Sequence, residues 1–163
     1  MISAILASTP YGGIGNKGTL PWPKHKEDLL WFKNHTKGNI VVMGRKTWDD
    51  PMMPKPLSDR INVVATSRPL LDPLSARRIQ GDIVSHILEL EKQFPEKEIF
   101  IIGGKELFES CKDIIKKIYL TRIKGDWYAD TRINLENWLH CFRIRSVRPG
   151  TECTYEIWKR EFF

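Results

Sequence analysis

Cysteine and histidine are both scarce in this chain of 163 residues. The three cysteines, Cys111, Cys141 and Cys153, lie far apart with no Cys-x-x-Cys pair, which excludes a disulfide scaffold and a four-cysteine zinc site. The histidines at positions 25, 35, 86 and 140 show no metal-ligand spacing, so we expect no metal centre and interpret each ring as a surface group. Widely spaced thiols indicate a reducing compartment, and we expect the protein in the cytoplasm.

Long apolar runs and blocks of like charge are missing as well. The apolar start, residues 2–7, is too short for a membrane span or a signal peptide, so we expect no membrane partner. Lys and Arg number 26 against 20 Asp and Glu, a net charge of +6, but they are scattered, which favours a mixed, solvated surface over nucleic-acid binding. Without a nucleophile elbow or a metal site, catalysis would depend on electrostatics, orientation and a cofactor.

Short apolar runs alternate with helical patterns along most of the chain. Strands are expected at residues 2–8, 40–43, 61–66, 98–102 and 117–123, with a short one near 78–80. Helices are expected at 26–36, in a turn from residue 44, at 83–93, and after residue 104 with apolar positions as far as 115. This alternation predicts an α/β fold in which residues 1–163 form a single domain, with a mainly parallel central sheet flanked by helices on both faces.

Two segments break the alternation. Three prolines within residues 51–56 indicate an exposed loop. The tail alternates apolar and polar residues at 141–147 and 153–158, on either side of residues 148–151. This pattern predicts a C-terminal antiparallel hairpin at the end of the sheet.

The first expected helix carries a carboxylate among apolar residues. Asp28 lies one turn before Trp31 and Phe32, so it shares a face with large apolar side chains. If that face is buried, desolvation favours the neutral acid unless a ligand completes it, as in acid–base and ligand-anchoring sites. The alternative is a carboxylate that only stabilises the helix N-terminus through the dipole. The segment by itself leaves both interpretations open.

Two strand-to-helix junctions contain glycine, at residues 43–47 and 102–106. Each would present backbone N–H groups to phosphate oxygens, and residues 66–68 could add hydroxyl and guanidinium contacts after a third strand. One such junction could be an ordinary tight turn, but three together indicate a ligand with several phosphates at the carboxyl ends of parallel strands. The Gly-x-Gly-x-x-Gly pattern at residues 13–18 is not a Rossmann site, because Pro21 and Pro23 prevent the helix that should follow.

Taken together, these residues resemble the dihydrofolate reductase family, and the bacterial form most of all. The resemblance covers essentially the whole chain, with its motifs in the family's order and close to its spacing. The motifs are the opening Met-Ile-Ser-Ala-Ile-Leu-Ala, Ile14-Gly15, Leu20-Pro21-Trp22, Asp28-Leu29-x-Trp31-Phe32-Lys33, Met43-Gly44-Arg45-Lys46-Thr47-Trp48, Pro56-Leu57-x-x-Arg60, Ile102-Gly103-Gly104, Tyr119-Leu120-Thr121 and Asp130-Thr131. The family implies reduction of 7,8-dihydrofolate to tetrahydrofolate, with hydride transfer from NADPH to C6 and protonation at N5. It also implies binding of antifolate inhibitors, and we expect a monomer.

The resemblance implies a set of substrate contacts. Asp28 would accept hydrogen bonds from the pterin amide N–H and amino group, supported by Thr121, and Trp22 would hold an ordered water near that carboxylate. Arg60 would pair with the α-carboxylate of the glutamate tail, because a planar fork fits a carboxylate. The other implied substrate contacts are Ile5, Phe32, Lys33, Leu57 and Ile102.

The resemblance likewise implies the cofactor contacts. Residues 13–24 would form a flexible loop that closes over the nicotinamide, where Leu20 seals the ring, and the paired glycines would share a cis peptide. Arg45, Ser67 and Arg68 stand where the family contacts the 2′-phosphate, which favours NADPH over NADH. The implied NADPH contacts are Ala7, Ile14, Gly15, Asn16, Gly18, Thr19, Leu20, Gly44, Arg45, Lys46, Thr47, Thr66, Ser67, Arg68, Ile102, Gly103, Gly104, Lys105, Glu106, Leu107 and Phe108.

Some positions depart from the family's pattern, and two other functions stay open. The loops between Trp22 and Asp28 and at 49–58 are longer, Lys105 replaces a third glycine in some members, and Phe108 replaces a common tyrosine. A reductase of the same fold could act on another pterin or a riboflavin precursor, although Asp28, Phe32 and Arg60 all fit folate. A non-catalytic or nucleic-acid-binding protein would have no reason to keep both the acid and the anion sites.

Overall fold

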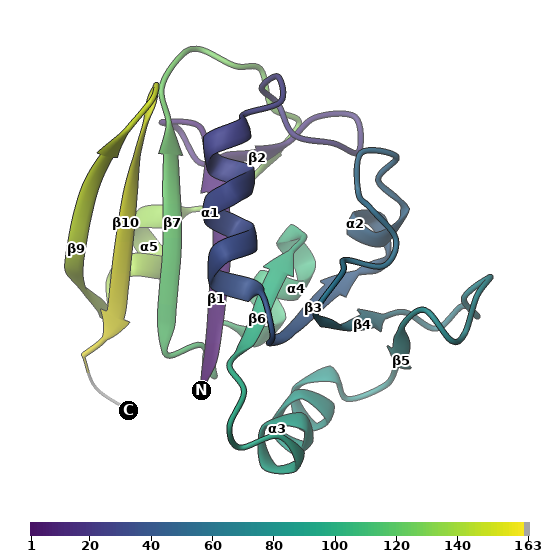
Figure 1. Ribbon diagram of the computed structural model, residues 1–163. Coiled ribbons are helices and arrows are strands. Elements are labelled where there is room, and N and C mark those ends of the chain that lie inside the picture. The colour runs from purple at the N-terminus through teal and green to yellow at the C-terminus, as the bar shows by residue number, and fades with distance from the viewer. Residues whose placement is uncertain (162–163) are drawn as a thin grey trace.

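An eight-stranded sheet runs through the molecule, which the computed structural model describes over residues 1–161 (Figure 1). Its strands are β1 (Ile2–Ser8), β3 (Ile40–Gly44), β4 (Ile61–Ala65), β5 (Arg77–Ile79), β6 (Ile99–Gly103), β7 (Lys117–Ile123), β9 (Phe142–Gly150) and β10 (Cys153–Arg160). The helices are α1 (Lys26–Thr36), α2 (Arg45–Asp49), α3 (Ile83–Gln93), α4 (Lys105–Cys111) and α5 (Leu135–Leu139). A two-stranded sheet pairs β2 (Gly13–Gly15) with β8 (Thr131–Arg132).

The order of the strands is β5-β4-β3-β6-β1-β7-β10-β9. From β5 to β7 every pairing is parallel, and β10 and β9 then add an antiparallel hairpin. The predicted α/β class with a mainly parallel sheet and a C-terminal hairpin is therefore confirmed. Among residues 1–161, every helix is too short or too polar to traverse a lipid bilayer.

Helices cover both faces of the sheet because successive strand side chains point in opposite directions. On one face, Ala4 and Leu6 of β1 pack in a cluster with side chains of α3, α4 and α5. On the other face, Ile5 belongs to a cluster with Trp48 of α2 and with Phe32 of α1. Helices α1 and α2 thus share the face that carries the expected site.

Two boundaries differ by more than two residues from the sequence expectation, and the elements α5, β2 and β8 were not expected. The helix after the paired glycines ends at Cys111, and Ile114 and Ile115 follow in turns whose N–H groups donate to the Cys111 carbonyl. This tightening carries the chain directly into β7 and buries Ile115 without further helix. The hairpin turn is also shorter than residues 148–151, because β9 extends to Gly150 and the turn consists of the next two residues. Pro149 is tolerated in β9 because β9 is the edge strand of the sheet.

Candidate active site

Asp28 lies in the first turn of α1, which Figure 1 shows in front of β1. His25 caps this helix: its Nδ1 accepts the Asp28 backbone N–H at 3.1 Å. Its other ring nitrogen, Nε2, lies 2.7 Å from the Thr151 carbonyl oxygen. Because Nδ1 accepts and Nε2 faces a carbonyl, the ring proton belongs on Nε2. His25 therefore has a structural role that the sequence analysis missed when it treated every histidine as a surface ring.

The Asp28 carboxylate points to the sheet rather than only to its own helix. Thr121 of β7 is 1% exposed, and its hydroxyl donates to Asp28 Oδ1 at 2.7 Å. Burial raises the pKa of Asp28 above its ordinary value, whereas the Thr121 hydrogen bond and the nearby His25 ring lower it. This carboxylate is half-buried, and among residues 1–161 no group donates to its Oδ2, which fits a ligand anchor better than a simple dipole contact.

The N-terminus of α1 is tied to the hairpin turn. The Thr151 backbone N–H donates to Glu27 Oε1 and its hydroxyl to Glu27 Oε2, each at 3.1 Å. Gly150 permits this approach, because a Cβ at that position would lie 2.4 Å from Glu27 Oε1 and 2.5 Å from a Tyr155 ring carbon. These contacts fix the turn of helix that carries Asp28, although the turn and the helix are far apart in sequence.

Trp22 is buried beside this anchor. It is 6% exposed and clusters with Ile123, Cys153 and Tyr155, with Ala7 and Trp31 packed against them. Its indole Nε1 finds no hydrogen-bond partner among residues 1–161. A buried donor of this kind needs an acceptor from outside the chain, such as a bound ligand or a solvent molecule.

The remaining implied substrate contacts surround the same face. Ile5 and Leu57 are buried, Phe32 and Ile102 are half-buried, and Lys33 is exposed on α1. The Arg60 guanidinium lies 5.8 Å from the centre of the Phe32 ring. Its Nη1 donates to the Thr36 hydroxyl at 3.0 Å and its Nε to the Ser58 carbonyl at 2.8 Å, whereas Nη2 has no acceptor within residues 1–161 and can meet a ligand.

The two glycine junctions come together at one edge of the sheet. Met43 of β3 stands opposite Gly103 of β6, and a Cβ on Gly44 would lie 3.7 Å from both the Gly103 carbonyl oxygen and the Gly104 nitrogen. The Gly103–Gly104 peptide is cis, as the resemblance implied. Gly44 and Gly104 are the N-caps of α2 and α4, and as glycines they leave the first N–H groups of both helices without a side-chain cap. The predicted pair of backbone anion sites is therefore one continuous surface.

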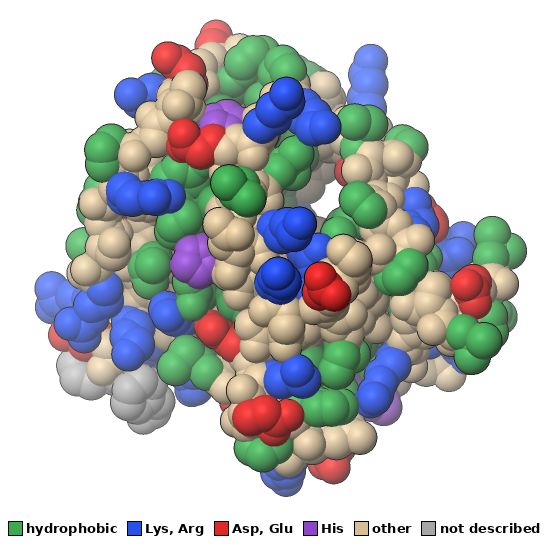
Figure 2. Space-filling view, in the orientation of Figure 1, with side chains coloured by type: hydrophobic (Ala, Val, Ile, Leu, Met, Phe, Trp, Pro, Cys, Tyr) green, Lys and Arg blue, Asp and Glu red, His purple; other side chains and the backbone are tan. Residues whose placement is uncertain are grey.

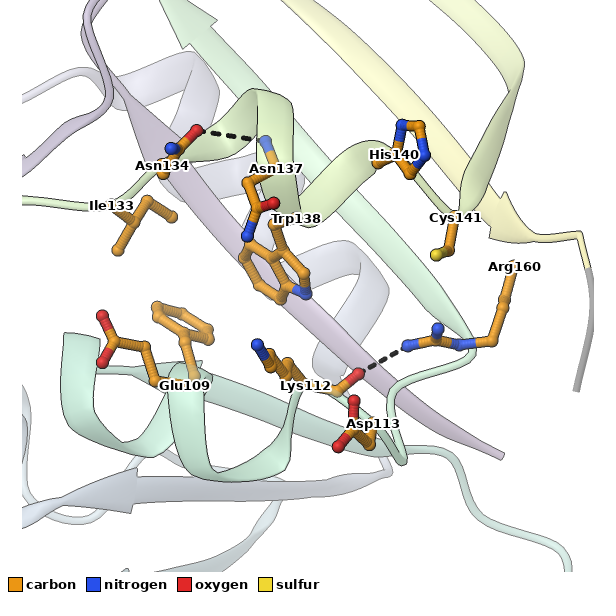
Figure 3. Close-up of a pocket in the computed structure, with 11 residues that line it drawn as sticks. Glu109, Lys112, Asp113, Ile133, Asn134, Asn137, Trp138, His140, Cys141 and Arg160 are labelled. Atoms are coloured by element: carbon orange, nitrogen blue, oxygen red, sulfur yellow. Dashed lines mark hydrogen bonds between the residues drawn. The ribbon is translucent and has the colours of Figure 1, made fainter.

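Side chains at this edge fall into two groups. Thr47 lies over the glycine pair, with its hydroxyl 3.6 Å from the position that a Cβ on Gly103 would occupy, and Lys46, Lys105 and Glu106 are exposed. Leu107 and Phe108 instead point into the core, so only their backbone can face a nucleotide. The Phe108 ring also packs on Trp138, with ring centres 5.5 Å apart, at the wall of a separate cavity of about 400 Å³ between α4 and α5 (Figure 3). Of the residues that the sequence predicts for the site, Phe108 alone is among those that line this cavity. We therefore place the candidate site at the edge of the sheet and not in this cavity.

Exposed arginines complete the edge beyond β4. Thr66, Ser67 and Arg68 follow this strand, and Arg78 of β5 donates to the Ser67 carbonyl at 3.0 Å. Arg45 donates through Nη1 to the carbonyls of Arg68 and Pro69, each at 3.4 Å. Arg78 was not expected from the sequence, although its place in the strand next to the 66–68 cluster could have indicated it.

The loop expected over the nicotinamide is partly ordered by β2. Gly15 pairs with Thr131, and the Lys17 N–H donates to Asp130 Oδ2 at 2.8 Å, a hydrogen bond that lowers the pKa of Asp130. Within this loop Ile14, Gly15, Asn16 and Thr19 are half-buried, and Gly18 is exposed with a φ of +82°. Leu20 is 44% exposed, a large apolar side chain open to a ligand. Figure 2 shows a hollow on this face between the surfaces over α1 and over α2.

A second histidine also departs from the expectation. His35 is half-buried on α1, with its ring 4.2 Å from that of Trp31 and 4.7 Å from that of Tyr119, measured between ring centres. Burial lowers the pKa of His35, and Lys117 lowers it further. Only His86 and His140 are fully exposed, as expected of surface rings.

Comparisons with known proteins agree with this geometry. The family model described as dihydrofolate reductase matches residues 1–160. Dihydrofolate reductase type 8 of Escherichia coli is 32% identical over 98% of this chain and 96% of its own length, and the Sus scrofa dihydrofolate reductase is 32% identical over 84% and 82%. The solved dihydrofolate reductase of Enterococcus faecalis, complexed with NADP(H) and RAB-propyl, superposes with a TM-score of 0.88 at 28% identity, covering 99% of this chain and 97% of that one. The chain belongs to the dihydrofolate reductase family.

Proposed function

We propose that this chain reduces 7,8-dihydrofolate to 5,6,7,8-tetrahydrofolate with NADPH as the reductant. The observation that carries the proposal is the half-buried Asp28 carboxylate, which accepts a hydrogen bond from Thr121. The two glycine junctions lie against each other at the ends of neighbouring strands of the same sheet. Family membership over residues 1–160 agrees with that activity. In this proposal NADPH, when bound, supplies the hydride, and the chain's own residues bind, orient and protect the reactants.

Asp28 would anchor the pterin ring. A carboxylate that accepts an amide N–H and an amino N–H together holds a flat heterocycle in one orientation. Burial raises the pKa of Asp28 above its ordinary value, and a carboxylate that accepts hydrogen bonds from the ring raises the basicity of the substrate's N5. The buried Nε1 of Trp22, which has no hydrogen-bond partner among residues 1–161, would donate to a solvent molecule or ligand atom beside Asp28.

The tail of the substrate would extend towards Arg60. Phe32 and Leu57 supply an apolar wall, and the Arg60 guanidinium is oriented by two hydrogen bonds while one nitrogen is left for a ligand. A guanidinium fixed in this way suits a carboxylate, because less rotational freedom is lost on binding. This arrangement favours a folate over a pterin without a glutamate tail.

The cofactor edge fits a nucleotide with a phosphate on its ribose. The contiguous glycine surface lets a pyrophosphate approach the backbone closely, and Arg45, Arg68 and Arg78 gather beyond it. Leu20 and the β2 loop would cover the nicotinamide and exclude water. Antifolates that present the same pair of donors would compete for Asp28. A monomeric, cytoplasmic protein stays our prediction.

The test is an NADPH-oxidation assay on the purified protein with and without dihydrofolate. We expect oxidation only when dihydrofolate is present, and inhibition by methotrexate. A parallel assay replaces dihydrofolate with a pterin that lacks the benzoylglutamate tail or with a riboflavin precursor. Faster turnover of either alternative than of dihydrofolate would overturn the proposal.

A further inference from the structure

The arginines at the cofactor edge are not free cations, because a carboxylate lies between them. Asp49 is the last residue of α2. Arg45 Nε donates to both of its carboxylate oxygens, at 3.2 Å to Oδ1 and 3.1 Å to Oδ2. Arg68 Nη2 lies 3.8 Å from the same Oδ2. Neither the implied family contacts nor the sequence analysis included Asp49. The side chain of Arg45 is 19% exposed, that of Asp49 49% and that of Arg68 67%, so the group is open to a ligand.

The Arg45–Asp49 pair is poorly explained as a helix-stabilising pair. In α2 the cation stands at the N-terminus and the anion at the C-terminus, four residues later. This orientation opposes the helix dipole, which favours acids at the start and bases at the end. The carboxylate is better explained by the second guanidinium, which comes from the segment after β4.

The charges decide what this carboxylate does to a ligand. Two guanidinium groups and one carboxylate leave one net positive charge for an incoming phosphate, where the arginines alone would offer two. A carboxylate next to the site repels a phosphate dianion, whereas it does not repel a neutral hydroxyl. A carboxylate can also accept a hydrogen bond from a ribose 2′-hydroxyl, as acidic residues do in sites that take NADH.

We propose that Asp49 is a specificity-determining residue that reduces the preference of this chain for NADPH over NADH. The inference rests on the proposed function, because it assigns the 2′-phosphate to Arg45 and Arg68. Asp49 competes with that phosphate for both guanidinium groups and leaves NADH binding intact. The wild-type chain therefore discriminates between the two nucleotides less than its arginines would allow.

The decisive variant is Asp49→Asn, which removes the charge and keeps the shape. Isothermal titration with adenosine 2′,5′-bisphosphate measures the effect without turnover, and we expect binding about three- to fivefold tighter than in wild type, the size of a partly exposed ion-pair effect. The affinity for 5′-AMP should change little, because the amide oxygen of Asn can still accept a hydrogen bond from the ribose 2′-hydroxyl. In steady-state assays the ratio of kcat/KM for NADPH to that for NADH should rise by the same factor, and the rise should shrink in high salt.

Glu161→Gln is the control. Glu161 also accepts from an arginine, Arg143 Nε at 2.9 Å, and Arg143 belongs to β9, at the opposite end of the strand order from β5. Both measurements should stay at wild-type values in this variant. Asp49→Glu keeps the charge, so both measurements should also stay near the wild-type values. This variant distinguishes an effect of the charge from an effect of impaired folding.

The outcomes separate the two proposals. Equal or weaker bisphosphate binding by Asp49→Asn would overturn the role of Asp49, whatever the enzyme reduces. Absence of dihydrofolate turnover in the wild type, with the bisphosphate still bound more tightly by Asp49→Asn, would overturn the proposed function and leave the inference standing.

Discussion

The two halves of the candidate site are built in different ways. In the substrate half, comprising Ile5, Asp28, Phe32, Leu57, Arg60 and Thr121, side chains from separate elements contact one another in partly buried surroundings. In the cofactor half, comprising residues 44–47, 66–68 and 103–107, the contacts come from backbone at glycine junctions and from exposed cations. The substrate half depends on a half-buried charge, whereas the cofactor half depends on accessible backbone N–H groups and on net charge.

This difference separates the expected effects of substitution. A buried charge has a shifted pKa, so changes in the substrate half should alter turnover and its pH dependence. Exposed cations act through solvent-screened attraction, so changes in the cofactor half should alter affinity and its salt dependence. Substitutions in each half test that separation.

Asp28→Asn should lower kcat at pH 7 by about a hundredfold or more, the range of lost acid–base assistance. The loss should be smaller in acid, where the substrate can arrive already protonated. Steady-state kinetics between pH 5 and 8 would measure both. The control is Asp82→Asn, because Asp82 caps α3 through the Ser85 N–H and has only a helix role. Equal kcat in Asp28→Asn and wild type would contradict the anchor.

The same variant should be more stable than wild type at pH 7. Because burial raises the folded-state pKa of Asp28, the folded protein binds more protons than the unfolded chain between pH 3.8 and that raised value. Ionisation of Asp28 therefore costs stability as the pH rises through this window, and Asn removes the cost. Urea unfolding at pH 7 would measure the gain, and a loss of stability would show that the carboxylate is structural.

Arg60→Lys should raise the KM for dihydrofolate about tenfold or more, the effect of losing a geometrically matched charged hydrogen bond. The value of kcat should change little, because the tail is remote from the reacting atoms. Arg77→Lys is the control, since Arg77 also lies over an aromatic ring, that of Phe94, at 5.3 Å. If kcat fell as much as KM rose, the tail contact would be wrong.

Arg68→Gln should raise the KM for NADPH about three- to tenfold and leave the KM for NADH unchanged, as expected for an exposed phosphate contact. The effect should vanish in high salt. Arg143→Gln is the matched control, because Arg143 is 68% exposed, close to the 67% of Arg68, and is also paired with an acid. A kcat effect as large as that of Asp28→Asn would break the separation of the two halves.

Thr121→Val should have the smallest effect, weakening dihydrofolate binding about threefold at pH 7 through the loss of one hydrogen bond. Since that hydrogen bond lowers the pKa of Asp28, its removal raises the pKa further. The ionised carboxylate is then lost at a higher pH, so the acid-side fall in affinity should begin at a higher pH than in wild type. Thr154→Val in the neighbouring strand should leave the profile unchanged.

Much of the fold follows from local sequence pattern. The helical periodicity of residues 26–36 and 83–93 and the apolar runs of β1 and β7 occur in the structure with the predicted bounds. Their patterns are continuous, and both helices follow a residue whose side chain caps the first turn, so local physics is sufficient. The predicted end of α4 and the predicted turn of the hairpin were wrong, because packing of Ile115 and the pairing of an edge strand decided them.

The site residues were predictable where a short stretch of sequence itself carries the signal. The glycine junctions and Asp28 have local signatures, and the structure brings the two junctions into contact as expected. His25, Arg78 and Asp49 were missed, because their partners are Thr151, Ser67 and Arg68, which lie on other elements. The clearest local signal belonged to Asp49, four residues after Arg45, and that spacing is typical of an ordinary helix pair.

The sequence by itself determined the strands of the main sheet, helices α1 to α4, the glycine junctions and the presence of one acid among apolar residues on the first helix, whereas α5, β2 and β8 were not expected. Only the tertiary structure decided that this acid meets a threonine 93 positions later, and that its helix is fixed by a hairpin turn. The reason is physical: secondary structure depends on residues a few positions apart, whereas the pKa of a buried acid and the pairing of distant charges depend on which elements the sheet brings together.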